Sequence, residues 1–316
     1  MNTDLAGKIL NRDKRGIARS ITLIENSNSD SAELLKKIYS NIGQAFRIGI
    51  TGPPGAGKST LTNQLTKYYR QKGKTVGIIA VEPTSPYTGG ALLGDRVRMS
   101  EIGQDDGVFI RSMATRGSLG GLSKKAIDAA DIIDAAGYDL IILETVGVGQ
   151  SELDIAQAAD TTIVVLVPES GDAVQAMKAG LMEIADFFVL NKSDRPGAKQ
   201  AVSAIKTILM MRDHDATSWI PNIIQTIASE NKGIEETASE IERHKEYLIN
   251  MGSLKKRREH RTRLRIKEIV EDKIRTELWI DSREMSLNSS VEKVVLGNLS
   301  PYHIADEILE NFRKQF

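Results

Sequence analysis

The stretch Phe46-Arg47-Ile48-Gly49-Ile50-Thr51-Gly52-Pro53-Pro54-Gly55-Ala56-Gly57-Lys58-Ser59-Thr60 decides the fold of this chain. Its first five residues form a short apolar run that is typical of a buried strand. The residues from Gly52 match the pattern G-x-x-x-x-G-K-[ST], and a helix is predicted to follow over Ser59–Lys72. In this order, the glycines let successive backbone N–H groups face one anion, and the helix dipole attracts the same anion. The stretch therefore predicts a phosphate-binding loop rather than a glycine turn before an ordinary helix.

A phosphate-binding loop of this type binds a nucleoside triphosphate, and each residue of the loop is expected to contact it. Lys58 is expected to reach the β- and γ-phosphate oxygens and to neutralise charge there, and the Ser59 hydroxyl is expected to ligate Mg²⁺. The predicted nucleotide contacts of the loop are Gly52, Pro53, Pro54, Gly55, Ala56, Gly57, Lys58, Ser59 and Thr60.

Composition limits the class of protein. The chain has 316 residues, 41% of them hydrophobic, which is enough for a large buried core. Lys plus Arg and Asp plus Glu number 42 each, so no net charge attracts nucleic acid or an anionic membrane, and neither partner is expected. The absence of Cys excludes disulfides and thiolate metal sites, and the first residues lack the apolar core of a secretory signal. The expected location is the cytoplasm.

Three zones are predicted along the chain: a helical N-terminal extension (1–43), a nucleotide-binding domain (44–250) and a helical C-terminal region (251–316). In the middle zone, short β-rich runs alternate with helical segments, which predicts an α/β fold of the P-loop NTPase class, with a mostly parallel central sheet flanked by helices. The predicted strands are Arg47–Ile50, Thr75–Val81, Val108–Arg111, Leu140–Glu144, Thr161–Leu166, Phe187–Asn191 and Ile220–Gln225.

Three acidic residues are candidates for holding the metal ion. Glu144 ends a predicted strand, where the crevice of such a sheet lies, and its carboxylate is expected to act on Mg²⁺ through water and to support catalysis. A strand-end acid in a salt bridge is the alternative. Glu82 and Asp95 can also reach a metal near the γ-phosphate, although each, taken alone, reads as a solvated loop residue. The Gly147 amide is placed to sense the γ-phosphate.

The base is predicted from Asn191-Lys192-Ser193-Asp194, which follows a strand. Asp194 can accept two hydrogen bonds from guanine N1–H and the 2-amino group, whereas adenine offers no matching donors. The Lys192 stem can lie along the ring. Ala228 and Ser229 are weaker candidates for backbone contact with the guanine oxygen. These residues predict that the nucleotides are GTP and GDP, bound with Mg²⁺.

Five segments together resemble the MeaB/MMAA/ArgK family, the GTPases associated with methylmalonyl-CoA mutase. The resemblance covers nearly the whole chain, and its most specific part is the run Glu144-Thr145-Val146-Gly147-Val148-Gly149-Gln150-Ser151-Glu152. The other segments are Gly55-Ala56-Gly57-Lys58-Ser59-Thr60, Gly94-Asp95-Arg96-Val97-Arg98-Met99, Ile110-Arg111-Ser112-Met113-Ala114-Thr115-Arg116-Gly117-Ser118-Leu119-Gly120-Gly121 and Asn191-Lys192-Ser193-Asp194.

The resemblance implies a chaperone that uses GTP to gate cofactor loading and to protect an adenosylcobalamin-dependent acyl-CoA mutase. It also implies a homodimer built partly from the C-terminal helices, and a mobile loop that would put Lys178 near the nucleotide. The family has Asp-Pro-Ser-Ser where this chain has Glu82-Pro83-Thr84-Ser85, which weakens the expectation that Glu82 ligates the metal directly.

No Gln directly follows Gly147 and no residue is marked as an arginine finger, so intrinsic GTP hydrolysis is expected to be slow. A docked partner would then supply or reorder the missing group, for example through Lys178 or Arg111. Other readings stay open: a transport-system kinase, a nickel metallochaperone GTPase, or a regulatory module that binds GTP without useful hydrolysis. The metallochaperone normally needs Cys or His ligands, and this chain has no Cys and four scattered His.

Overall fold

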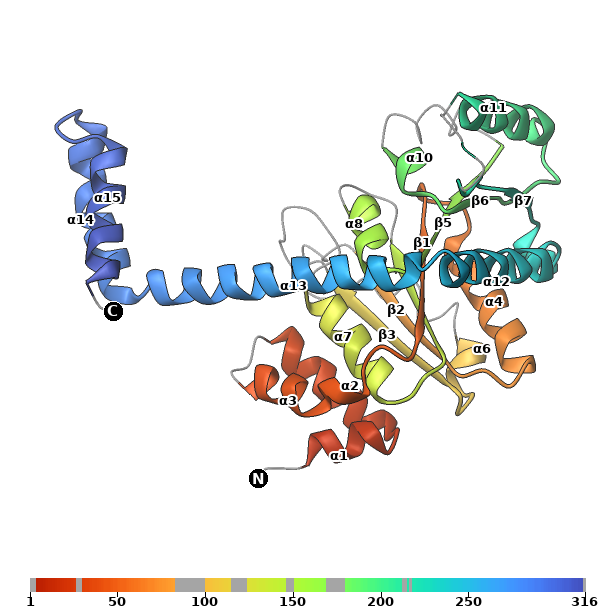
Figure 1. Cartoon of the computed structure of the whole chain (residues 1–316), viewed down its shortest axis with the longest axis horizontal. Coiled ribbons are helices and arrows are strands. Elements are labelled where there is room, and N and C mark those ends of the chain that lie inside the picture. Colours follow the sequence, from red (N-terminus) through yellow and green to blue (C-terminus); the bar gives the residue numbers. More distant parts are fainter. Residues whose placement is uncertain are drawn as a thin grey trace. The chain divides into compact units, whose positions relative to one another are not determined.

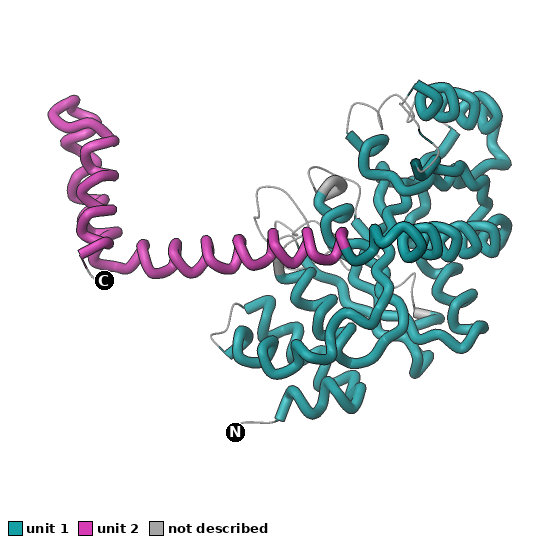
Figure 2. Tube along the Cα trace, viewed as in Figure 1, with its two compact units in different colours: residues 1–255 teal, residues 256–316 magenta. Residues whose placement is uncertain are grey.

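The computed structural model describes residues 4–26, 30–82, 100–114, 124–145, 151–168, 180–211, 215 and 218–314. Their contacts divide the chain into two compact units, residues 1–255 and 256–316, which Figure 2 shows in different colours. The predicted N-terminal extension lies in the first unit together with the nucleotide-binding domain. A search of the described helices found none with the length and apolar character that a bilayer span requires.

The first unit is built on a seven-stranded parallel sheet in the order β3-β2-β4-β1-β5-β6-β7 (Figure 1). The strands are β1 Phe46–Thr51, β2 Val76–Glu82, β3 Val108–Ala114, β4 Leu140–Thr145, β5 Thr161–Leu166, β6 Phe187–Leu190 and β7 Ile223–Gln225. The predicted α/β class is confirmed. The last strand begins at Ile223, three residues later than predicted, because Pro221 has no N–H to donate to a ladder.

Strand β1 lies between β4 and β5, so the segment that follows it leaves from the middle of the sheet. All residues of β1, β4 and β5 are buried, as expected for parallel strands covered on both faces. In the register, Ile50 lies opposite Glu144 and Thr51 lies opposite Val164. The chain passes from β1 to β2 on one side of β1, whereas β5, the neighbour on its other side, follows β4. A crevice for a ligand is expected at the carboxyl ends of the strands at such a point, where the strand order changes direction.

Helices cover both faces of the sheet (Figure 1). The N-terminal helices and α7 and α8 share one core with β2, β3 and β4, whereas α4, α6 and α12 share the opposite core with β1. Helices α10 and α11 pack on β5 and β6. The helices of this unit are α1 Leu5–Leu10, α2 Lys14–Glu25, α3 Asp30–Ile38, α4 Lys58–Gln71, α6 Ser100–Gly103, α7 Lys124–Ala135, α8 Ser151–Ala158, α10 Leu181–Ile184, α11 Ala198–Met210 and α12 Ile234–Asn250, with short 3-10 turns at Tyr39–Asn41 and Ala228–Glu230.

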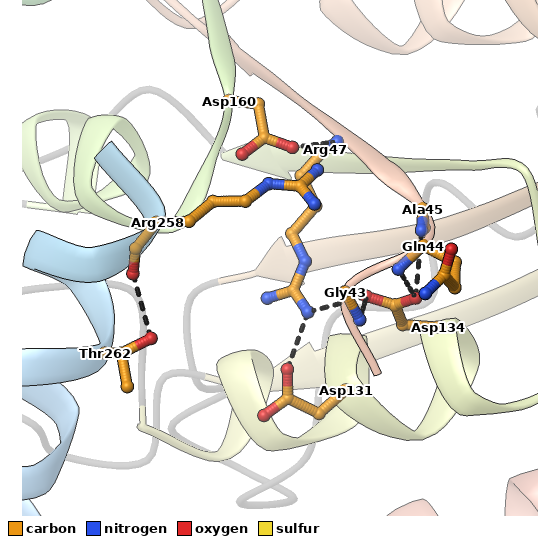
Figure 3. A network of polar contacts seen from close by, with 9 residues as sticks. All are labelled: Gly43, Gln44, Ala45, Arg47, Asp131, Asp134, Asp160, Arg258 and Thr262. Atoms are coloured by element: carbon orange, nitrogen blue, oxygen red, sulfur yellow. Dashed lines mark hydrogen bonds and ion pairs between the residues drawn. The ribbon is translucent and has the colours of Figure 1, made fainter. Parts of the chain in front are cut away.

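A buried polar network fixes the chain where it enters β1 (Figure 3). The Asp134 carboxylate accepts hydrogen bonds from the backbone N–H groups of residues 43–45 at 2.9, 3.0 and 2.9 Å. The Arg47 guanidinium pairs with Asp131 at 2.6 Å and with Asp134 at 3.2 Å. Burial alone would lower the pKa of Arg47, but the attraction of Asp131 and then of Asp134 and Asp160 raises it overall. The network therefore joins β1 to α7 through buried ion pairs and backbone hydrogen bonds.

The second unit is helical. It holds most of α13 Ser253–Leu278, then α14 Asp281–Val295 and α15 Pro301–Arg313. Ser300 caps α15 by accepting a hydrogen bond from the His303 N–H at 3.1 Å, with Pro301 in the first turn. Arg283 donates from Nη1 to the carbonyls of Glu277 and Leu278 at 2.8 and 2.9 Å, which ties α14 to the end of α13.

Candidate functional site

The loop between β1 and α4 requires glycine at three positions. Gly52, Gly55 and Gly57 have φ of 134°, 77° and 90°, in the left-handed region that other residues rarely adopt. A Cβ at Gly52 would lie 2.1 Å from the Val165 carbonyl oxygen, and one at Gly57 would lie 2.2 Å from Asn191 Nδ2. At Gly55 a Cβ would meet no atom of the described residues within 4 Å. The loop is therefore packed against its neighbours at Gly52 and Gly57 but not at Gly55, an arrangement that suits the binding of an anion.

Lys58 and Ser59 begin α4 and face the end of β4. Lys58 is 6% exposed, and its Nζ donates to the carbonyls of Gly52 and Pro53 at 2.7 and 2.9 Å. The Ser59 hydroxyl donates to Glu144 Oε1 at 2.6 Å. The site thus brings a cation, a hydroxyl and a carboxylate to one edge of the sheet. A hydroxyl and a carboxylate oxygen are ligands that Mg²⁺ prefers, so these residues fit a magnesium ion held between phosphate and protein.

Asn191 joins three segments around the loop. Its Nδ2 donates to the Ala56 carbonyl at 2.8 Å, and its Oδ1 accepts from Thr226 Oγ1 and from the Ala228 N–H, both at 3.0 Å. The side chain is 3% exposed, so all of these bonds are shielded from water. Asn191 therefore holds the phosphate loop against the segment that begins at Thr226. No pattern in the sequence indicated this role for the Thr226 hydroxyl.

Lys192 and Asp194 lie at the same edge. Lys192 has a φ of 55°, and its Nζ donates to the Gly55 carbonyl at 2.8 Å, so its stem runs toward the loop. Asp194 and Ser229 are exposed, whereas Ala228 is buried. The pKa of Lys232 is raised by its hydrogen bond and ion pair with Glu230 and, more weakly, by the attraction of Asp194. The Asp194 carboxylate is thus exposed to solvent and lies close to Lys232, beyond the 3-10 turn at Ala228–Glu230.

Several predicted residues cannot be placed in the same way. Asp95, Gly147 and Lys178 lie outside the described residues, and only the backbone of Glu82 is described, as the last residue of β2 opposite Ala114. No group of three or more His, Asp or Glu side chains that could hold a metal ion was found in the described part of the chain. The placed metal candidates are therefore Ser59 and Glu144.

Arg111, which was predicted to be available to a docked partner, has another role. Its guanidinium forms an ion pair with Glu25 and donates to Thr22 Oγ1 at 3.1 Å. The Arg111 side chain is 18% exposed and lies against the end of α2. It would have to leave Glu25 in order to reach a phosphate.

Comparison with known proteins gives a consistent result. Residues 17–283 match the sequence model of the family described as methylmalonyl-CoA mutase-associated GTPase MeaB. A protein of Pyrococcus abyssi, named only provisionally as a GTPase, is 46% identical over 312 residues, which are 98% of this chain and 96% of the relative. The GTPase ArgK of Escherichia coli is 35% identical over 270 residues, 83% of this chain and 82% of ArgK.

A mitochondrial protein of Mus musculus, the methylmalonic aciduria type A homolog, is 30% identical over 321 residues, 95% of this chain and 76% of that protein. Among solved structures, that of an LAO/AO transport system kinase superposes with a TM-score of 0.72 at 26% identity, covering 98% of this chain and 97% of that one. Sequence and structure thus agree on one set of relatives.

Proposed function

This chain belongs to the family of methylmalonyl-CoA mutase-associated GTPases, and from that membership we propose that it is a GTP-dependent chaperone of an adenosylcobalamin-dependent acyl-CoA mutase. In this role, GTP binding and hydrolysis would gate the loading of the cofactor and protect the mutase from inactivation. The observation that carries the proposal is the match of the family over residues 17–283, which includes both the phosphate loop and the base-reading segment.

GTP and its magnesium ion would be held by the residues at the carboxyl edge. The loop amides and Lys58 would bind the phosphates, Ser59 and Glu144 would hold Mg²⁺, and Asp194 would read guanine. Support comes from the 2.6 Å hydrogen bond between the Ser59 hydroxyl and Glu144 Oε1, and from the positive φ of three loop residues, which glycine adopts readily. Magnesium, when bound, would neutralise charge on the transferring phosphoryl group. Lys58 must exchange its bonds to Gly52 and Pro53 for phosphate oxygens when the nucleotide enters.

The intrinsic rate of hydrolysis is proposed to be slow and to rise when the mutase docks. Phosphoryl transfer depends on an oriented water and on cations near the transferring group. Arg111 is held by Glu25, so Lys178 is the better candidate for a cation that the partner brings into place.

The second unit is proposed to form a homodimer. Helices α14 and α15 enclose a hollow of about 230 Å³ lined almost entirely by apolar side chains, among them Trp279, Val291 and Ile304. Met285, Val295, Leu296 and Tyr302 are exposed by 71, 79, 66 and 82%. So many exposed apolar side chains beside an apolar hollow are unusual for a surface that faces only water and are typical of an interface. Light scattering of the full chain and of a chain ending near residue 250 would test the dimer.

A direct test of the chaperone role uses purified mutase. The protein is mixed with methylmalonyl-CoA mutase and adenosylcobalamin, and both GTP hydrolysis and cofactor transfer are followed with GTP, GDP and a non-hydrolysable GTP analogue. Faster hydrolysis with mutase, together with cofactor transfer that depends on which nucleotide is present, is expected. Equal hydrolysis and equal transfer under all conditions, repeated with isobutyryl-CoA and ethylmalonyl-CoA mutases, would contradict the proposal.

One structural relative favours a second candidate function. Because the LAO/AO transport system kinase shares the fold over nearly its whole length, a phosphotransferase is the alternative. The two functions differ in where the γ-phosphate goes. With γ-labelled GTP, the chaperone releases all label as inorganic phosphate, whereas a kinase transfers it to an acceptor protein.

A further inference from the structure

Helix α2 is attached at both ends to the same two neighbours, β3 and α7. At the start of the helix, Lys14 Nζ donates to the carbonyl of Asp105, just before β3, at 2.8 Å. Arg12, two residues before the helix, donates from Nε to the carbonyl of Ala136, just after α7, at 3.1 Å. These contacts lie at the amino edge of the sheet, where β3 begins and α7 ends.

At the last turn of α2, a single residue makes both attachments. The Glu25 carboxylate pairs with Arg111 in the middle of β3, and the Glu25 carbonyl accepts a hydrogen bond from Lys125 Nζ, in the first turn of α7, at 2.5 Å. The side chains of Arg111 and Glu25 are 18 and 14% exposed, so their attraction is weakly screened by water. Two cations at the last turn of α2 also complement its negative end.

The Glu25–Arg111 pair lies close to the level of the nucleotide site. Arg111 is opposite Ile79 of β2, and the next residue, Ser112, is opposite Ala80, which is in turn opposite Glu144 of β4. The Glu25–Arg111 pair is therefore one residue along β3 from the row of paired residues that contains Glu144. Strand β2, which β3 borders, ends at the metal candidate Glu82.

Strand β3 needs such support because, among the described strands, it lies at the end of the sheet and pairs with β2 alone. A terminal strand lacks the lateral hydrogen bonds that hold a central strand on its second side. We propose that Glu25 and Arg111 are positioning residues for the GTPase site: they fix the middle of β3 to the last turn of α2 beside the start of α7, and through β2 they hold the metal-binding edge in place. This inference rests on the magnesium site proposed above.

The test compares Glu25→Gln with the wild type, using Glu33→Gln as the control. Glu33 belongs to the same helical extension but forms an exposed pair with Lys36, whose side chains are 66 and 68% exposed. The Mg²⁺ concentration that gives half-maximal GTP hydrolysis is measured, as is GDP affinity without metal. Glu25→Gln is expected to raise that Mg²⁺ concentration about three- to tenfold, as is typical of coupled residues. GDP affinity without metal and the control variant stay at the wild-type values.

Two further variants separate positioning from stability. The double variant Glu25→Arg with Arg111→Glu restores an ion pair and is expected to recover the Mg²⁺ dependence. Thr22→Val removes the hydrogen bond that Arg111 donates to the Thr22 hydroxyl, together with the one that this hydroxyl donates to the Ala18 carbonyl within α2. It leaves the Glu25–Arg111 pair in place, so it is expected to shift the Mg²⁺ dependence in the same direction by less. A fall in melting temperature without a change in Mg²⁺ dependence overturns the inference. Wild-type hydrolysis that does not depend on Mg²⁺ overturns both the inference and the proposed metal site.

Discussion

Asp134 and Asn191 do the same kind of work at opposite ends of β1. Asp134 binds three backbone N–H groups below the strand, and Asn191 binds one carbonyl, one hydroxyl and one N–H above it. Both are buried, but the first is charged and paired with Arg47, whereas the second is neutral and borders the phosphate loop. The comparison suggests that ionic groups anchor the strand where no ligand binds, and a neutral group shapes the loop where a charged ligand must enter.

Asp134→Ala should give the largest effect. It leaves Arg47 with one fewer partner and orphans the N–H groups of residues 43–45, so the free energy of unfolding should fall by about 3–5 kcal/mol. Denaturant unfolding would measure it. Asp106→Ala is the control, because the Asp106 side chain is fully exposed and lies 3.7 Å from Lys14. A loss of nucleotide affinity in the folded Asp134 variant that exceeds the loss of stability would break the comparison.

Asn191→Ala should act on the other end of the strand. Without Nδ2 and Oδ1, Ala56 loses its tie to Thr226 and Ala228, and GDP affinity should fall by about 2–3 kcal/mol while stability changes less. Asn222→Ala removes an amide that bonds Glu240 at the opposite edge of the sheet, so it should leave GDP affinity unchanged. Calorimetric titration with GDP and thermal unfolding of both variants would show which term dominates.

Asp194→Asn should sharpen the comparison, because it changes base recognition and leaves the contacts of Asp134 and Asn191 intact. The amide loses an acceptor for guanine and gains a donor for the 2-oxo group of xanthine. We expect guanine nucleotide affinity to fall by about 1.5–3 kcal/mol and xanthine nucleotide affinity to rise. Competition between GDP and XDP would measure the exchange. Equal losses for both bases would mean that Asp194 supports the loop rather than reads the base.

Acid should weaken the amino edge through carboxylates other than Asp134. The hydrogen bond from Arg70 lowers the pKa of Asp105. Burial alone would raise the pKa of Asp139, but hydrogen bonds from the N–H and the hydroxyl of Thr75 lower it overall. A folded-state pKa below the unfolded value of about 3.9 stabilises the protein above that pH, and the stabilisation is lost as pH falls through the folded value. The melting temperature should therefore decline below about pH 4. Asp105→Asn should reduce this decline.

The residues of the phosphate loop and the base segment could be predicted because each acts through local backbone geometry. Glycines at fixed spacing followed by Lys58 and Ser59 specify one turn, and alternating apolar runs specify a parallel sheet. Ser59 and Glu144 were each predicted to act on Mg²⁺, Glu144 because the crevice of a parallel sheet lies at its strand ends. Their direct hydrogen bond was not predicted. The C-terminal region was predicted only as helical, and the structure divides its described part into α13, α14 and α15. The middle helix, α14, has several exposed apolar residues, and these obscure the helical period in the sequence.

The sequence by itself determined the class of fold, the order of the strands along the chain and the glycine-rich loop that is predicted to bind phosphates, since these depend on neighbours a few residues apart. Only the tertiary structure decided that Asp134 anchors the entry to β1, that Asn191 joins the loop to Thr226, and that Glu25 holds Arg111. These contacts join residues 35 to 135 positions apart. Such pairings depend on how helices pack on the sheet, and no local pattern records which buried polar group will meet which partner.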